Sequence, residues 1–221
     1  MSIEILTPGR LTYADALALQ HRCVDELLAG TGPEKLILLE HEPVYTIGRT
    51  RDQSSLLVRD QLPFPVVETN RGGQATYHGP GQLVGYPILD LNKRGRDLHL
   101  YLRTLEDLLI ELCLQYGVSA TRREGLTGVW VENRKIASLG VGVRKWITMH
   151  GFALNVLETS LPPFAHITPC GIANVSITSV ETESSRPILL AKVTARCAAL
   201  TIDHFSGIVG EIQELQTRLQ R

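Results

Sequence analysis

Cys170 has the clearest potential for chemistry in this sequence. It stands between Pro169 and Gly171 in the stretch PPFAHITPCGIAN, which has no regular periodicity, so we expect a thiol on a loop. A cysteine attacks as the thiolate, and because a free thiol has a pKa of about 8.5, a neighbouring group must lower that pKa. Acyl transfer through a thioester is one reaction that such a thiol supports.

The other three cysteines are predicted to be inert. Cys23, Cys113 and Cys197 each fall in a run with apolar residues at helical spacing, where a thiol packs as a small apolar group. The four cysteines show no CxxC pair and no Cys/His ligand spacing. We therefore expect neither a metal site nor a disulfide framework.

A second candidate is the glycine-rich stretch RGGQATYHGPGQLVGY at positions 71–86. Glycine allows positive φ and a close approach of the backbone to a ligand, so this composition is typical of a loop wrapped around a bound group. The loop glycines are Gly72, Gly73, Gly79 and Gly81, and the polar side chains are Arg71, Thr76, His78 and Gln82. A tight turn is the alternative interpretation, although turns rarely need so many glycines together with a histidine. The spacing fits neither GxxxxGK[ST] nor GxGxxG, so the two common phosphate-binding loops are excluded.

Composition narrows the class of protein. With 221 residues and 43% hydrophobic residues, the chain is long enough for one well-buried core, and we expect a single domain over residues 1–221. Lys and Arg total 22 against 23 Asp and Glu, a balance that argues against a nucleic-acid binder. No apolar run approaches the roughly 18 residues of a membrane span, and the N-terminus lacks a signal-peptide pattern. A cytoplasmic protein without membrane contact is therefore expected.

The elements that must position these residues follow from periodicity and turn signals. We expect helices at 12–29 and 97–116, with Thr12 and Asp15 forming the N-terminal cap of the first, and two further helices at 186–203 and 207–220. Strands are predicted at 35–40, 44–47, 66–69, 83–90, 128–132, 135–143 and 146–155, with a hairpin turn at 132–134. Consecutive strands mixed with helices indicate an α+β or mixed α/β fold.

Four motifs, in order, resemble the lipoyl(octanoyl) transferases. They are EHEPVYTIGR at 40–49, RGGQATYHGPGQLVGYPILDL at 71–91, GVWVENRKIASLGVGVRKWITMHGFALNV at 128–156 and ITPCGI at 167–172. The resemblance implies a mixed β-sheet packed by helices around an acyl tunnel, similar to the biotin/lipoate-protein ligase catalytic domain. It also implies transfer of an octanoyl group from octanoyl-acyl carrier protein to a lysine of a lipoyl domain through a cysteine thioester. This is the first step of endogenous protein lipoylation, and it needs no cofactor.

The resemblance also assigns site residues. It makes Cys170 the nucleophile and Lys135, in RKIAS, its partner, although spacing alone would place Lys135 in solvent beside a hairpin. A nearby ammonium lowers a thiol pKa by Coulombic attraction, and the same amine can carry protons in both half-reactions. The implied lining of the acyl site is Arg71, Gly72, Gly73, Gln74, Ala75, Thr76, Tyr77, His78, Ser138, Leu139, Gly140, Gly151, Phe152 and Ala153.

Glycines and histidines within the motifs suggest finer roles. Gly140, Gly142 and Gly151 interrupt apolar strands and could leave a slot for a linear acyl chain, while β-bulges are the alternative. We expect His78 to position the loop or the acyl carbonyl and His150 to lie behind it. Cys–His catalysis is the competing mechanism.

The implied partners are octanoyl-acyl carrier protein and, as acceptors, lipoyl domains of 2-oxoacid dehydrogenase complexes or the glycine cleavage H protein, with this chain as a monomer. The carrier is acidic, so basic clusters are candidate docking sites. These clusters are Arg49 with Arg51, Lys93 to Arg96, Arg122 with Arg123, and Arg144 with Lys145. Two other functions stay open: an ATP-dependent lipoate or biotin ligase, and a non-catalytic acyl-carrier-binding protein.

Overall fold

The main sheet of the protein has eight strands. The computed structural model describes residues 2–49, 55–56, 62–168 and 175–219. The strands of this sheet are β1 Ile3–Leu11, β2 Glu34–His41, β6 Gln82–Ile88, β7 Thr121–Arg123, β8 Leu126–Val131, β9 Arg134–Arg144, β10 Ile147–Asn155 and β11 Ser176–Ile177. Their order is β1-β2-β6-β10-β9-β8-β7, with β11 paired to β9. Parallel pairs, β1 with β2 and β11 with β9, occur beside antiparallel ones, so the sheet is mixed.

A second, three-stranded sheet contains the middle of the glycine-rich stretch, while residues 82–86 belong to β6 of the main sheet. It consists of β4 (Val66–Glu68), β3 (Val44–Ile47) and β5 (Thr76–His78), in the order β4-β3-β5. The Tyr77 ring contacts the rings of Tyr45 and Phe164, and these residues belong to a small core of this sheet. Part of the stretch predicted as a loop is therefore a buried strand, β5.

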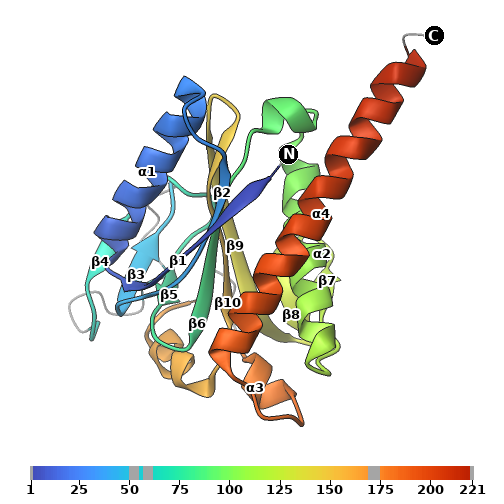
Figure 1. The fold of residues 1–221 in the computed structure, drawn as a ribbon. Helices are drawn as coiled ribbons and strands as arrows, with labels where there is room; N and C mark the ends of the chain where they lie inside the picture. Colours follow the sequence, from blue (N-terminus) through green and yellow to red (C-terminus); the bar gives the residue numbers. More distant parts are fainter. Residues whose placement is uncertain (1, 50–54, 57–61, 169–174, 220–221) are drawn as a thin grey trace.

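Helices cover both faces of the main sheet. They are α1 Tyr13–Ala29, α2 Leu98–Gln115, the short α3 Val180–Glu183 and α4 Leu190–Leu219. Short 3-10 helices occur at Leu91–Arg94 (η2), Glu158–Ser160 (η3) and Pro162–His166 (η4). α1 and the small sheet lie on one face, whereas α2 and α4 lie on the other (Figure 1). The fold is thus a mixed sheet between two layers.

Local sequence signals account for both ends of α1. The Thr12 hydroxyl caps α1 by accepting a hydrogen bond from the Asp15 N–H at 3.1 Å, which confirms the predicted cap. At the other end Gly30 adopts the left-handed conformation that commonly ends helices. The helix buries Cys23 against the sheet, as predicted.

The remaining two helical cysteines are inert core thiols. Cys113 and Cys197 are both fully buried, between α2, α4 and the sheet. Burial raises the pKa of each thiol to about 12, so both stay protonated at neutral pH. This confirms the prediction that neither is a nucleophile.

At the ends of the chain one prediction is wrong and one strand was missed. The expected helices at 186–203 and 207–220 form one helix, α4, which begins at Leu190, after Pro187, a residue that disfavours helical backbone at the position before it. Gly207 does not end α4, since glycine inside a helix costs only about 1 kcal/mol. β1 was not predicted, because Pro8 and Gly9 are typical strand breakers; an edge position and a register shift between Leu6 and Gly9 accommodate them.

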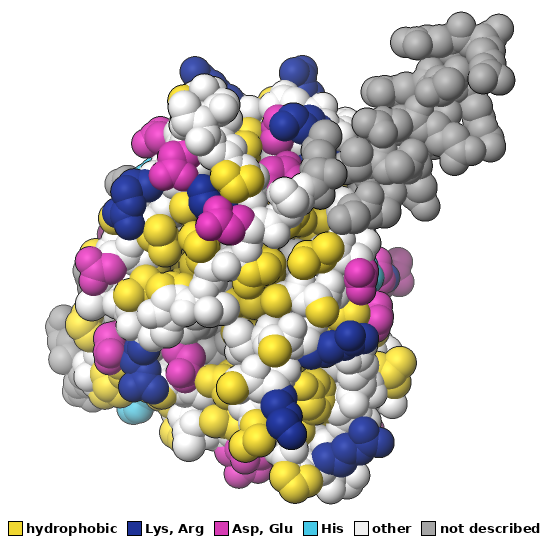
Figure 2. Space-filling model, in the orientation of Figure 1, with side chains coloured by type: hydrophobic (Ala, Val, Ile, Leu, Met, Phe, Trp, Pro, Cys, Tyr) yellow, Lys and Arg dark blue, Asp and Glu magenta, His cyan; other side chains and the backbone are white. Residues whose placement is uncertain are grey.

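An apolar groove runs between the edge of the main sheet and the first turns of α4. Ile5, Leu38 and Leu83 line one wall, and Leu190 and Ala195 line the other. Figure 2 shows apolar side chains gathered in the middle of this face, with lysines and arginines scattered among acidic residues. Among the described residues no helix is long and apolar enough to cross a membrane.

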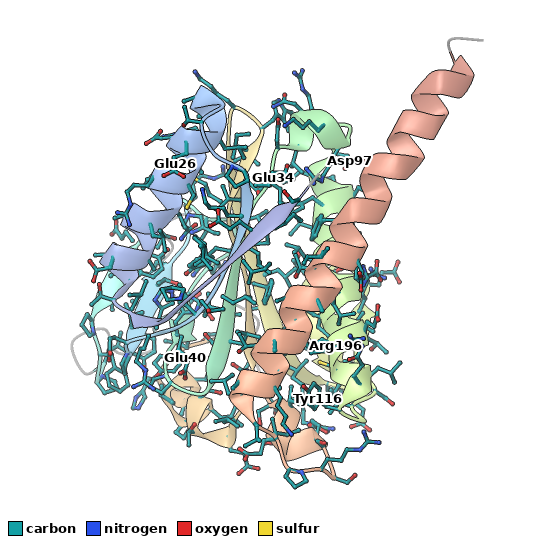
Figure 3. The ribbon with its side chains drawn as sticks, viewed as in Figure 1. Glu26, Glu34, Glu40, Asp97, Tyr116 and Arg196 are labelled. Atoms are coloured by element: carbon teal, nitrogen blue, oxygen red, sulfur yellow. The ribbon has the colours of Figure 1, made fainter. Side chains whose placement is uncertain are left out.

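A buried ion pair joins the start of β2 to η2. The Arg94 guanidinium donates to Glu34 through Nη2 and Oε2 at 2.7 Å, and both side chains are almost completely buried. Figure 3 labels Glu34, whose carboxylate also accepts from the Asp90 N–H at 2.8 Å. Arg94 is therefore unable to dock an acidic partner, which corrects the interpretation of residues 93–96 as one basic docking cluster.

We predict that Glu34→Gln lowers the free energy of unfolding by about 3 to 5 kcal/mol, because it leaves the Arg94 charge buried without its counter-ion. Urea denaturation measures this directly. The control is Glu132→Gln, which removes the exposed partner of Arg134 and should cost about 1 kcal/mol or less. Equal effects of the two substitutions would contradict the structural role of the buried pair.

Candidate active site

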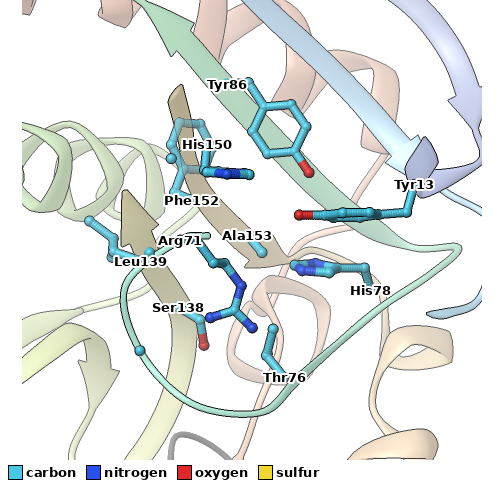
Figure 4. Close-up of a pocket in the computed structure, with 13 residues that line it drawn as sticks. Tyr13, Arg71, Thr76, His78, Tyr86, Ser138, Leu139, His150, Phe152 and Ala153 are labelled. Atoms are coloured by element: carbon cyan, nitrogen blue, oxygen red, sulfur yellow. The ribbon is translucent and has the colours of Figure 1, made fainter. Parts of the chain in front are cut away.

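A pocket lies between the small sheet and the main sheet, next to the start of α1 (Figure 4). The atom-free space between its lining residues is about 440 Å³, a volume that includes open solvent. Of the residues predicted to line an acyl site, those around this pocket are Arg71, Gly73, Thr76, His78, Ser138, Leu139, Gly140, Gly151, Phe152 and Ala153. Segments far apart in sequence thus converge on one cavity, while a tunnel stays a prediction.

Four residues of the predicted lining lie elsewhere and hold the loop. The Gly72 N–H donates to the Val141 carbonyl of β9 at 3.0 Å. Gln74 accepts from the Ser55 hydroxyl at 2.8 Å. Ala75 and Tyr77 are buried in the core of the small sheet.

The pocket has three further lining residues, Tyr13, Tyr86 and His150. Sequence reasoning missed the two tyrosines, because Tyr13 carries only a helix-start signal and Tyr86 only a strand signal. His150 was predicted to lie behind the pocket but lines it. Its φ of 57° is in the left-handed region, and regular pairing of β10 with β6 begins only at Phe152.

Arg71 fixes the shape of the glycine-rich segment. Its buried guanidinium donates to the Gly72 and Gln74 carbonyls at 2.9 and 2.8 Å. It also donates to Thr46 of β3, reaching the hydroxyl at 2.7 Å and the carbonyl at 2.9 Å. One charged side chain therefore ties the turn to the small sheet and brings positive potential to the pocket.

Glycines at the pocket bring backbones together. A Cβ at Gly48 would lie 1.8 Å from the Gly73 carbonyl oxygen, one at Gly140 would lie 2.8 Å from the Gly72 oxygen, and one at Gly151 would lie 2.3 Å from the Gly85 oxygen. Gly142 faces the Asn70 carbonyl at an ordinary 3.6 Å. The absence of a Cβ at Gly48, Gly140 and Gly151 thus makes room for neighbouring backbone, and an acyl slot at Gly140 and Gly151, which also line the pocket, stays a prediction. The β9–β10 register is continuous, so no bulge explains these glycines in that ladder.

Lys135 is buried beside the preceding strand. It is only 2% exposed, so the interpretation as a lysine in solvent is wrong. Its Nζ donates to the Thr127 carbonyl at 3.1 Å and lies 5.2 Å from the centre of the Trp130 ring. The side chain passes over Gly128, where a Cβ would lie 2.6 Å from the Lys135 Cε. We call Thr127, Gly128 and Trp130 the lysine cradle.

A buried carboxylate secures this cradle. The Glu106 Oε1 of α2 accepts from the Gly128 N–H at 3.0 Å, and its other oxygen accepts from Arg122 at 2.9 Å. Arg123 lies over the same Trp130 ring, 5.1 Å from its centre. The cations at 122 and 123 thus have partners within the fold.

Cys170 lies outside the described residues, but the segments before and after it are placed. The Thr168 N–H donates to the Ser55 carbonyl at 2.7 Å, and Ile167 bridges to Leu56. After the gap, Ile177 of β11 pairs with Lys135 of β9. The chain therefore returns alongside the buried lysine seven positions after Cys170.

Most of the chain matches one protein family. Residues 12–201 match the family described as the lipoyl protein ligase A/B catalytic domain. An octanoyltransferase from Geobacter metallireducens is 54% identical over 185 residues, covering 84% of this chain and 85% of that relative.

Solved structures share the fold at low sequence identity. Lipoate-protein ligase A bound with ATP has a TM-score of 0.73 at 14% identity, covering 93% of this chain and 86% of that chain. Biotin protein ligase from Aquifex aeolicus has a TM-score of 0.53 at 10% identity, covering 97% of this chain and 72% of that chain. These likenesses confirm the predicted fold class.

We predict that Gly128→Ala displaces Lys135 from its cradle, because the new methyl group would overlap the lysine stem at a residue whose φ is +132°. Peptide mass spectrometry after labelling with an amine-reactive reagent should show protection of Lys135 in the parent and modification in the variant. The control is Gly125→Ala, also at positive φ but with no atom of the described residues within 4 Å of its Cβ. Protection that survives in Gly128→Ala would contradict the steric argument.

We also predict that stability falls as the pH drops from about 6.5 towards 4. Burial lowers the pKa of both His41 and His150 to about 4, so in this range the unfolded chain binds protons that the folded chain does not. Each histidine should contribute a slope of about 1.4 kcal/mol per pH unit, measurable by urea denaturation across pH. His41→Gln should flatten the dependence, and a slope in this variant equal to that of the parent would contradict the assignment.

Proposed function

The chain belongs to the lipoyl protein ligase A/B catalytic domain family and is an octanoyltransferase, and we propose that its donor is octanoyl-acyl carrier protein and its acceptor a lysine of a lipoyl domain. The observation that carries the proposal is the 54% identity to an octanoyltransferase over 84% of this chain. The convergence of the glycine-rich segment, β9 and β10 on one pocket supports it. The acceptor lysine would belong to a 2-oxoacid dehydrogenase complex or to the glycine cleavage H protein.

We propose a two-step reaction through Cys170. The Cys170 thiolate attacks the thioester carbonyl of the donor, a new carbon–sulfur bond forms, and the carrier thiol leaves with a proton. The product of this step is an octanoyl thioester on Cys170. The acceptor amine then attacks its carbonyl, loses a proton, and expels the Cys170 thiolate. Because the donor thioester is already activated, neither step needs ATP, a metal or another cofactor.

Lys135 is proposed to carry the protons and to favour the thiolate. Its burial and its bond to the Thr127 carbonyl hold the amine in one place, which is what proton transfer requires of an acid or base. A charged Lys135 near Cys170 would lower the thiol pKa by Coulombic attraction. The pairing of Ile177 with Lys135 supports this nearness, since it brings the chain after Cys170 beside the lysine.

The pocket is proposed to hold the octanoyl chain. Leu139, Phe152 and Ala153 supply apolar wall, while Arg71 and His78 keep the loop in place. Burying about seven methylene-like groups at about 0.8 kcal/mol each contributes on the order of 5 to 6 kcal/mol before entropy costs, which favours octanoyl over short acyl groups.

We propose that the acidic carrier docks beside Arg49. The Arg49 N–H donates to the Arg71 carbonyl at 2.8 Å, so its exposed side chain lies next to the pocket loop; its predicted neighbour Arg51 lies outside the described residues. The cluster at 144–145 is less suitable, because Arg144 pairs with Asp25. A cytoplasmic monomer is the state in which we propose that the enzyme acts.

The ligase alternative has weaker support. The ligase structures share the fold at 10 to 14% identity, and one of them is described as bound with ATP, which concerns that protein. A non-catalytic carrier-binding protein would have no need for a buried lysine beside the segment that follows Cys170. Whether an acyl adduct forms on the protein, and whether it needs ATP, distinguishes the transferase, the ligase and the non-catalytic binding protein.

We predict a covalent octanoyl adduct on the parent protein after mixing with octanoyl-acyl carrier protein in the absence of ATP. Intact-protein mass spectrometry should detect a hydroxylamine-labile adduct that a lipoyl domain discharges. Cys170→Ser should form no such thioester, and Lys135→Met should form it at least about 100-fold more slowly. Cys23→Ala is the matched control and should react like the parent, since Cys23 lies on the buried face of α1. Activity seen only with free octanoate and ATP would instead establish the ligase.

A further inference from the structure

A chain of buried hydrogen bonds connects Arg71 of the pocket to the backbone of Lys135. It passes from the small sheet to the main sheet through five buried residues, of which the first four contribute their side chains and the last its backbone: Thr46, His78, Gln82, Asn155 and Thr178. Its links are Arg71 Nη2 to Thr46 Oγ1 at 2.7 Å, Thr46 Oγ1 to His78 Nε2 at 3.3 Å, His78 Nδ1 to Gln82 Oε1 at 2.8 Å, Gln82 Nε2 to Asn155 Oδ1 at 2.9 Å, Asn155 Nδ2 to Thr178 O at 3.0 Å, and Thr178 N to Lys135 O at 3.0 Å.

The Thr178 end determines which atoms of this chain carry hydrogens. The Thr178 carbonyl can only accept, so the Asn155 amide nitrogen must face it, and the Asn155 oxygen must then face Gln82. Gln82 therefore donates with Nε2, which also points at the Tyr77 carbonyl at 3.2 Å. The Gln82 oxygen is left to accept from His78, so His78 must carry its hydrogen on Nδ1.

The Arg71 end requires the same arrangement. A guanidinium can only donate, so the Thr46 hydroxyl accepts from Arg71 and has its single hydrogen free for His78 Nε2. Nε2 accepts that hydrogen only when it is unprotonated. Both ends thus specify one neutral tautomer, and every donor points in the same direction along the chain, an arrangement that strengthens each bond.

We propose that Gln82 and Asn155 are positioning residues that hold His78 as the neutral Nδ1–H tautomer and thereby tie Arg71 to the strand that carries Lys135. His78 is then a link between pocket and lysine and takes no part in proton transfer. The catalytic consequence rests on the proposed function, because it takes Lys135 and the pocket as parts of one acyl-transfer site.

The surroundings of His78 oppose its protonated form. His41, Tyr13, Arg71 and His150 face it from β2, α1, the glycine-rich segment and β10. An imidazolium would direct a second N–H at a Thr46 oxygen that already accepts from Arg71. Burial first, and then the nearby His41 and Arg71, keep the pKa of His78 well below its ordinary value.

The tautomer is tested by NMR of protein labelled with 15N at histidine, which distinguishes protonated from unprotonated ring nitrogens. The His78 signals are assigned as those missing from His78→Asn. We expect Nδ1 to be protonated and Nε2 unprotonated in the parent, and this pattern to be lost in Gln82→Met, which removes the acceptor. Gln20→Met is the matched control. Gln20 is also buried and accepts from the backbone N–H of His150 at 2.7 Å, but it is not part of this series of hydrogen bonds, so the His78 tautomer should persist.

Kinetic measurements then distinguish His78 as a structural link from His78 as a catalytic acid or base. His78→Ala and Gln82→Met should both lower kcat on the order of 10- to 100-fold through misplacement of the site. His78→Asn, whose amide can still donate to Gln82, should recover most of that rate. Equal loss in His78→Asn and His78→Ala, or full activity in Gln82→Met, would overturn the proposal.

An imidazolium or an Nε2–H tautomer in the parent would also overturn it. Because the NMR readout needs no substrate, it stands apart from the proposed function. If the protein shows the expected His78 tautomer but does not transfer octanoyl, the proposed function is wrong and the proposed series of hydrogen bonds still holds.

Discussion

The contact on which the site depends is the packing of backbone against backbone where the glycine-rich segment meets the two sheets. The Gly73 carbonyl occupies the place of a side chain at Gly48, and the Gly72 carbonyl does the same at Gly140. The Gly72 N–H then bonds to Val141 on β9. With any larger residue at these positions the segment would stand off the main sheet, and the pocket walls contributed by residues 71–78 and by β9 would separate.

Where the two sheets meet, buried hydrogen bonds between polar groups make the site rigid. Arg71 is held by loop carbonyls and by Thr46, and His41 is held by Tyr86 and by the Leu11 carbonyl. Burial keeps the neighbouring histidines in their neutral forms. In such a desolvated place a polar group has little freedom to reorient, so the dipoles that line the pocket are already arranged before any ligand binds.

Sequence reasoning predicted the central elements well, because strands such as β2 and β10 and helices such as α1 carry strong periodicity and a cap. It failed where tertiary context decided: Pro8 hid an edge strand, and the one helix over Leu190–Leu219 was predicted as two. The motifs pointed to most of the residues that surround the pocket, whereas Tyr13 was invisible because only the fold brings α1 to the pocket. The burial of Lys135 was equally out of reach, since its position beside a hairpin is typical of an exposed lysine.

The lysine cradle links two positions that local rules would treat as independent. The volume that a side chain at residue 128 would fill is taken by the stem of Lys135, seven positions later on the neighbouring strand. Glycine at 128 is therefore a condition for keeping Lys135 where it is. The reverse does not hold: a descendant that replaced Lys135 with a short residue would still have the Ala137 carbonyl oxygen 2.9 Å from a Cβ at 128 and a φ of +132° there, so glycine would stay the residue that fits after the lysine was lost.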